Sequence, residues 1–158
     1  MADYVFIFGA TNDNEWVINI QGSSSKSGTP LDVFPQKPDC NDNQQWELVP
    51  GGGSYYFIKS KLNGKNVITV NGTSVEASEQ KSPASDDQLW ELVAGTLWTT
   101  AGLQYSYFQN KKDNNVITIP EGTTKSKTKL QMSSWSGSPN QQWIFSSGVG
   151  PFGVQTTP

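Results

Sequence analysis

The chain has 158 residues, enough for one domain around one hydrophobic core. Charged residues make up 16% of it and the net charge is −3, so it lacks both the strong net charge of a disordered chain and the cluster of basic residues that nucleic-acid binding needs. Histidine is absent and cysteine occurs once, which removes the commonest general base and an internal disulfide, and argues against a zinc site.

The N-terminal segment is predicted to be a strand. Residues 4–8 read Tyr-Val-Phe-Ile-Phe, with no basic residue before them and no cleavage site after a longer apolar core, so a first strand is expected here and not a secretory signal. No apolar run approaches the roughly 18 residues of a membrane-spanning helix, so no membrane insertion is expected. Together with the lone Cys40, these features indicate a cytoplasmic protein, for which non-classical release is the remaining way out of the cell.

Three copies of one unit follow in chain order. Each copy opens with an aromatic-rich segment, at residues 4–6, 55–57 and 105–108. A Val-Ile block comes next, at residues 17–20, 67–70 and 116–119. Each copy ends with a Gln-x-Trp motif, at residues 44–46, 88–90 and 141–143. The first two copies also share a Gln-Lys pair, at residues 36–37 and 80–81, and repetition of this kind indicates a symmetric fold.

The repeated blocks are predicted to be short strands, because they are rich in Val, Ile, Thr and Trp and are bounded by Gly, Asn, Ser and Pro. Side chains alternate along a strand, so Ile18 and Ile20 point to one side and Asn19 to the other. In the first Gln-x-Trp motif, Gln44 and Trp46 share one side of a predicted strand. We expect the three tryptophans to form the core and their glutamines to satisfy buried backbone groups.

No single unit could bury its apolar face alone, so the three are expected to close around a pseudo-threefold axis. No helical period is sustained, and helix content should be very low. The predicted fold is therefore an all-β β-trefoil, a single domain over residues 1–158. Its units cover about residues 1–50, 51–95 and 96–147, and a C-terminal tail at 148–158 either is flexible or packs across the base.

Three Gln-x-Trp motifs, each with its upstream Val-Ile block, resemble the ricin-B-type lectins over residues 4–146. The form without a signal or disulfides is most similar to the cytoplasmic fungal members, and bacterial members are similar. The resemblance implies a non-catalytic, multivalent lectin for galactose or N-acetylgalactosamine-type glycans of glycoproteins or glycolipids, with a defensive role. It implies no cofactor and no metal, and since many members are dimers it implies a homodimer.

The resemblance also implies which residues bind sugar in the first unit. A typical site has an acidic or amide residue in the Val-Ile block, an aromatic ring in the loop before the motif, and the Asn before the motif Gln. These positions are filled by Asn19, Asp32, Phe34 and Asn43. An aromatic ring stacks on the apolar face of a sugar, and polar groups bond its hydroxyls. Asn19 stands where the family often has Asp, and Phe34 could instead simply close the barrel.

In the third unit the corresponding set is Thr118, Gln131, Trp135 and Asn140. Trp135 is expected to be a sugar platform, and the alternative is a loop anchor packed on the surface. The second unit keeps Thr69, Glu76 and Asp87 but has Ser78 in place of the ring, so its site is expected to be weak or inactive.

Two other classes of function remain open from the sequence. A β-trefoil protease inhibitor would use exposed loops of the same fold. An enzyme would have to use carboxylates alone, such as the pairs Asp86–Asp87 or Asp39–Asp42, but turn chemistry explains adjacent acids better. The alternating lysines at 125, 127 and 129 are interpreted as a solvated edge.

Overall fold

The computed structural model describes residues 3–11, 16–150 and 152–158. Within these residues the chain forms twelve strands joined by loops and short 3-10 turns, with no α-helix. The first unit contains β1 (Phe6–Gly9), β2 (Trp16–Ile20), β3 (Thr29–Pro35) and β4 (Trp46–Gly52). The second contains β5 (Tyr55–Ser60), β6 (Asn66–Asn71), β7 (Ser74–Glu79) and β8 (Trp90–Trp98). The third contains β9 (Gln104–Asn110), β10 (Val116–Thr118), β11 (Gln131–Ser133) and β12 (Trp143–Ser146).

The first and last strands of the three units form a closed ring of antiparallel strands. Neighbours pair in the order β1, β12, β9, β8, β5 and β4. The ring closes between β4 and the residue before β1, where Val5 and Trp46 exchange backbone hydrogen bonds of 2.9 and 2.8 Å. Closure leaves this barrel with no free edge.

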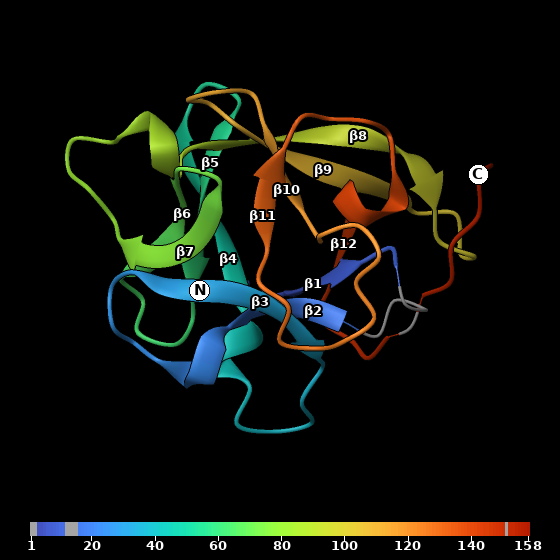
Figure 1. Cartoon of the computed structure of the whole chain (residues 1–158), viewed down its shortest axis with the longest axis horizontal. Helices are drawn as coiled ribbons and strands as arrows, with labels where there is room; N and C mark the ends of the chain where they lie inside the picture. Colours follow the sequence, from blue (N-terminus) through green and yellow to red (C-terminus); the bar gives the residue numbers. More distant parts are fainter. Residues whose placement is uncertain (1–2, 12–15, 151) are drawn as a thin grey trace.

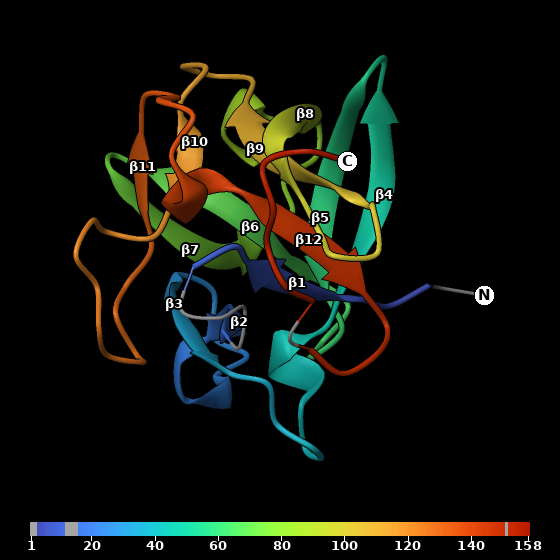
Figure 2. The same ribbon diagram turned by 90° about the vertical axis from the view of Figure 1, so that its right-hand side faces the viewer.

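The middle strands form three hairpins, β2–β3, β6–β7 and β10–β11, that gather at one end of the barrel (Figures 1 and 2). Each hairpin pairs with the next: β3 with β7 at Pro30 and Glu76, and β7 with β11 at Ser74 and Gln131. An antiparallel β-bridge between Asp32 and Lys129 joins the third unit to the first. A six-stranded barrel capped by three mutually paired hairpins is the predicted β-trefoil, which is confirmed.

The three motif tryptophans occupy equivalent places in one core. Trp46, Trp90 and Trp143 are each fully buried and belong to a single hydrophobic cluster. Each indole N–H donates to the carbonyl oxygen of the second residue of the Val-Ile block, in the pairs Trp46–Ile18 (3.2 Å), Trp90–Ile68 (2.9 Å) and Trp143–Ile117 (3.3 Å). The prediction that these tryptophans form the core is confirmed.

The motif glutamines lie in 3-10 turns before β4, β8 and β12, at Asp42–Gln44, Asp86–Gln88 and Pro139–Gln141. The prediction that Gln44 extends the strand of Trp46 is therefore wrong, because the chain turns one residue before that strand begins. The prediction of their role is right. Each amide accepts from a backbone N–H and donates to a backbone carbonyl of the loop after the third strand, which for Gln44 are Lys37 N (2.9 Å) and Pro35 O (3.0 Å).

The C-terminal tail packs against the barrel. Phe152 meets Phe8 edge-on with ring centroids 5.0 Å apart, and the buried Tyr105 hydroxyl donates to Gly153 O over 2.9 Å. Backbone hydrogen bonds between Trp98 and Gln155 add a short bridge. Of the two states left open by the sequence, the structure shows the packed one.

A search of the described residues for a helix both long and apolar enough to cross a membrane finds none.

Candidate carbohydrate site

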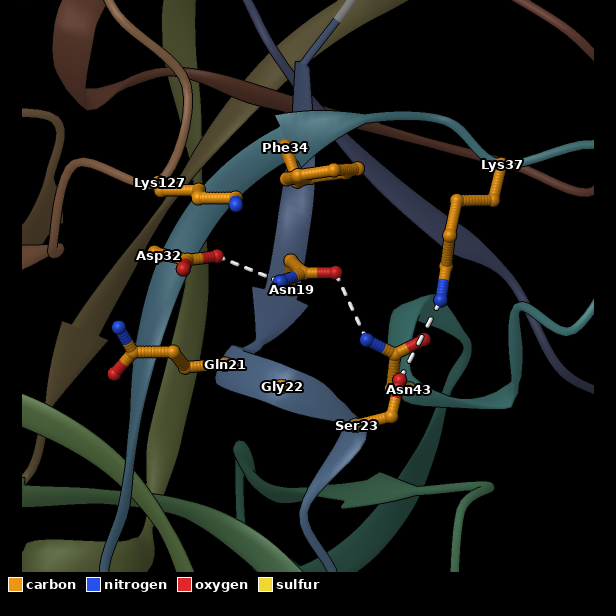
Figure 3. Close-up of a pocket in the computed structure, with 9 residues that line it drawn as sticks. All are labelled: Asn19, Gln21, Gly22, Ser23, Asp32, Phe34, Lys37, Asn43 and Lys127. Atoms are coloured by element: carbon orange, nitrogen blue, oxygen red, sulfur yellow. Dashed lines mark hydrogen bonds between the residues drawn. The ribbon is translucent and has the colours of Figure 1, made fainter.

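The first unit contains a pocket of about 330 Å³ at the side of the β2–β3 hairpin (Figure 3). This volume falls within the roughly 300–1,000 Å³ typical of small-ligand sites. Its walls come from β2, β3, the turn Gln21–Ser23, the loop that precedes β4, and one residue of the third unit. The lining residues are Asn19, Gln21, Gly22, Ser23, Asp32, Phe34, Lys37, Asn43 and Lys127. All four sugar-binding residues predicted for the first unit are therefore brought together.

Asn19 forms hydrogen bonds to three neighbouring side chains at the base of the pocket. Its side-chain N–H donates to Asp32 Oδ1 over 2.7 Å, and its Oδ1 accepts from Asn43 (2.9 Å) and Gln44 (3.1 Å). Only 5% of Asn19 is exposed. Since both polar atoms already have protein partners, Asn19 positions the residues around it.

Asp32 and Phe34 lie two residues apart on β3, so a carboxylate and an aromatic ring share the face that lines the pocket. Asp32 Oδ1 accepts from Asn19, while no hydrogen bond reaches Oδ2 within the described part of the chain. Burial raises the pKa of the Asp32 carboxyl above its usual value, against the opposing effects of the Asn19 hydrogen bond and the Lys127 charge. Asp32 therefore offers one free acceptor beside a half-buried ring.

Asn43 supplies a second free acceptor. Its side-chain N–H donates to Asn19 Oδ1 and to Ile20 O, at 2.9 and 3.0 Å, which fixes the amide plane. Asn43 is 3% exposed, and its Oδ1 is buried without a hydrogen-bond partner. A buried acceptor without a donor costs about 1–3 kcal/mol. A ligand hydroxyl that donated to this atom would remove that cost.

Lys37, Lys127, Gln21 and Ser23 also line the pocket, and sequence reasoning gave them no role in binding. The repeated Gln-Lys pair was a visible signal for Lys37. Lys127 was interpreted as part of a solvated edge. It is exposed, but it also reaches the pocket wall, because the loop before β11 hydrogen-bonds to Val33 of β3.

In the second unit, different residues with different contacts fill the equivalent positions. Thr69 stands opposite Glu76 as Asn19 stands opposite Asp32, and Ser78 takes the place of Phe34. Both Glu76 oxygens have partners in their own hairpin, Asn71 (2.9 Å) and Ser78. Asp87 forms an ion pair with Lys81 over 2.6 Å. Asp87 Oδ1 is buried without a hydrogen-bond partner among the described residues. With no ring, and with both Glu76 oxygens and Asp87 Oδ2 engaged, this unit is the least suited to bind a sugar.

The pKa of Asp87 follows from these contacts. Burial alone would raise it, but hydrogen bonds from Lys81 and Ser85 and the charges of Lys81 and Lys112 together lower it below the usual value.

The third unit keeps the amide but not the ring position. Thr118 faces Gln131 across the β10–β11 pair, and Asn140 donates to Ile119 O over 2.7 Å, as Asn43 does to Ile20. The position of Phe34 is filled by Ser133. Trp135 lies two residues farther on, where its ring stacks on Tyr107 of β9 at 3.8 Å between centroids and 16° between planes. The structure thus gives Trp135 the packing of a loop anchor, and its role as a sugar platform stays a prediction.

The acids weighed as catalytic candidates are mostly paired with lysines. Three of these four acids lie within ion-pair distance of a lysine, as Asp42–Lys61 (3.5 Å), Asp86–Lys111 (3.6 Å) and Asp87–Lys81 (2.6 Å). In the described residues, no group of three or more Cys, His, Asp or Glu side chains is placed to hold a metal ion.

Comparison with known proteins gives the same family as the motifs. Residues 42–99 match the family described as ricin-type beta-trefoil lectin domain-like. No curated protein matches the chain at a significant level.

Solved structures match over nearly the whole chain at low identity. A designed threefold-symmetric protein, ThreeFoil, superposes with a TM-score of 0.76 and 21% identity, covering 90% of this chain and 96% of that one. The C-half of an earthworm R-type lectin, solved in complex with GalNAc, gives a TM-score of 0.70 and 20% identity over 90% and 96% of the two chains. An exo-β-1,3-galactanase from Clostridium thermocellum gives 0.74 and 18%, covering 90% of this chain but only 29% of the enzyme. The chain therefore has a β-trefoil fold, and its residues 42–99 resemble the ricin-type lectin-like family.

Proposed function

We propose that the protein binds carbohydrate without modifying it, and that the pocket of the first unit is its principal site. The observation that carries the proposal is the pair of free acceptors, Asp32 Oδ2 and Asn43 Oδ1, beside the half-buried ring of Phe34. A pyranose has one apolar face and a rim of hydroxyls. The ring can take the face and Asp32 Oδ2 can take a hydroxyl proton directly, while Asn43 Oδ1, which is buried from solvent, can take one only once the side chains over it move.

The sugar class proposed is galactose or N-acetylgalactosamine at the end of a glycan. The earthworm R-type lectin with the same fold was solved with GalNAc, which supports this class. A carboxylate makes the stronger, charge-assisted bond to a sugar hydroxyl, and here Asp32 supplies it. The amide of Asn19 holds that carboxylate in place.

Multivalent binding is also part of the proposal. The third unit keeps Gln131 and Asn140 and would form a second, weaker site. Two weak sites on one molecule gain strength when they engage one glycosylated surface together.

The test is a glycan array probed with the parent protein and with Phe34→Ser. Serine already stands at this position in the second and third units, as Ser78 and Ser133, so the fold accommodates it. We expect galactose- or GalNAc-terminated glycans to bind the parent and to bind the variant at least tenfold more weakly, with thermal unfolding recorded as the check on folding.

A parent protein that bound no glycan on the array would overturn the proposal. A panel of proteases assayed with the same samples would then test inhibition, the other function open to this fold.

A further inference from the structure

Lys37 and Lys81 occupy the same position in the first and second units. Each backbone N–H donates over 2.9 Å to the glutamine of its own Gln-x-Trp motif, Gln44 or Gln88. The Lys37 carbonyl also accepts from Asn41 at 2.9 Å. The motif glutamine therefore fixes the backbone of the lysine in both units, and the two side chains can be compared directly.

The two ammonium groups meet different surroundings. Lys81 Nζ lies 2.6 Å from the Asp87 carboxylate. In the first unit that acid is replaced by the uncharged Asn43, and Lys37 Nζ reaches only the Ser23 hydroxyl, at 3.5 Å. No described carboxylate lies within ion-pair distance of Lys37. The first pocket therefore contains a positive charge that its own unit does not compensate.

A second cation enters from the third unit. Lys127 has a positive φ of 64°, and its backbone N–H donates to Val33 O over 2.7 Å. Glycine fills the equivalent positions, Gly28 (φ 91°) and Gly72 (φ 63°). A left-handed conformation is strained for a residue with a side chain, because Cβ comes too close to the backbone, and glycine avoids this strain. Only in the first pocket is a lysine kept at this strained position, where its charge acts on Asp32.

One of the two cations is enough to balance Asp32, so the pocket lining carries a net charge of +1. The whole chain carries −3, so an acidic ligand would be attracted by the pocket and not by the protein surface at large. In Figure 3, Lys127 lies on the side of Asp32, and Lys37 lies on the other side, near Asn43 and Ser23. The surplus charge is thus at the end of the pocket away from the carboxylate.

We infer that this pocket takes a saccharide with an anionic substituent, a carboxylate or a sulfate ester, seated against Lys37 Nζ and Ser23 Oγ. The inference rests on the proposed function. The sugar ring stacks on Phe34, a neutral hydroxyl donates to Asp32 Oδ2, and the acidic group pairs with Lys37 as the Asp87 carboxylate pairs with Lys81 in the second unit.

The test uses a glycan array printed with matched sets, each neutral galactose- or GalNAc-terminated glycan beside its sialylated, uronic acid and sulfated derivative. We expect at least tenfold stronger binding to an acidic member than to its neutral parent, and the carboxylate and sulfate members distinguish the two sources of charge. Lys37→Gln should remove the preference, so that it binds the acidic and neutral members of each set equally. Lys81→Gln, the same change where the charge is already paired, should leave the preference intact. Raising ionic strength should weaken the preference in the parent protein.

The outcomes separate the two proposals. Equal binding within the matched sets, or a preference that survives in Lys37→Gln, would overturn the acidic-ligand inference and leave the lectin function standing. Absence of binding to every glycan would overturn both. Lys127→Gly provides a second variant. Glycine stands at this position in the other two units, and its backbone conformation suits glycine. This variant should also reduce the acidic preference.

Discussion

Asn19 and Asp32 face each other across the β2–β3 pair, and the Asn19 amide donates to the Asp32 carboxylate over 2.7 Å. The family often has an acid at the position of Asn19. Here an amide stands at that position, and Asp32 on the paired strand supplies the carboxylate of the pocket. Because Asp32 is nearly fully buried, its ionisation has consequences for both binding and folding.

Sugar binding should weaken on acidification earlier than an ordinary aspartate would predict. Burial raises the pKa of Asp32, so the carboxylate takes up its proton at a higher pH than an exposed one would. The protonated group loses its charge-assisted bond to a sugar hydroxyl. Calorimetry with the glycan that binds best on the array, repeated at pH values from 7 to 4, should show the affinity falling as the pH is lowered. In Asp32→Asn the affinity should be lower and flat over the same range; an unchanged slope in that variant would contradict the assignment.

Asp32→Asn should also stabilise the fold at neutral pH. A carboxyl whose pKa is raised on folding favours the folded state below the unfolded pKa, near pH 4, and that contribution is lost as pH rises through the folded pKa. Asparagine does not titrate and can still accept from Asn19. Urea unfolding should therefore give the variant the higher free energy of unfolding at pH 7, and the difference should shrink toward pH 3. A variant less stable than the parent at pH 7 would refute this account.

The motif glutamines give a matched pair of variants. Gln88→Ala and Gln44→Ala should each lower the free energy of unfolding by about 1–3 kcal/mol, because each leaves a loop N–H and a loop carbonyl without a partner. Only Gln44→Ala should also lower glycan binding, since Gln44 holds Asn19 and Lys37 in the first pocket. Denaturant unfolding and glycan binding measured on both variants check this; equal binding losses would contradict it.

The barrel could be predicted from the sequence because its determinants are local and repeated three times. Alternation along each block places Ile18 and Ile20 inward and Asn19 outward, and tertiary packing agrees with it. Asp32, Phe34 and Asn43 came from the family pattern and not from this alternation. What the alternation missed was where each strand begins: Gln44 lies in a turn because its amide bonds the preceding loop.

The place of Lys127 in the pocket could not be predicted from the sequence, for a different reason. Lys127 reaches the first unit only through pairing of its loop with β3, a contact between distant segments that no local pattern encodes. The packing of Trp135 depends on a distant segment in the same way. Its flanking Ser and Gly residues indicated an exposed ring, but the partner that covers it, Tyr107, lies on a strand nearly thirty residues earlier.

The third unit can be tested by separating the packing of Trp135 from binding. Trp135→Ala should lower the free energy of unfolding by about 1 kcal/mol, because the stack on Tyr107 is lost, and should also lower glycan binding. Tyr107→Ala loses the same stack but keeps the indole. If both variants lose stability and binding alike, Trp135 is only an anchor. A larger binding loss in Trp135→Ala, with similar unfolding curves, identifies a second sugar site.

The tail should become the weak point of the fold at alkaline pH. Burial raises the pKa of the Tyr105 hydroxyl from 10.0 to about 12, and this hydroxyl donates to Gly153 O. Between these values the unfolded chain loses its proton while the folded one keeps it, so stability falls as pH rises through the window. Tyr105→Phe should remove this alkaline loss and cost about 0.5–1.5 kcal/mol at pH 7 for the missing hydrogen bond. Unfolding measured from pH 9 to 12 checks both effects. A parent and variant that lost stability in parallel above pH 10 would show that another group controls alkaline unfolding.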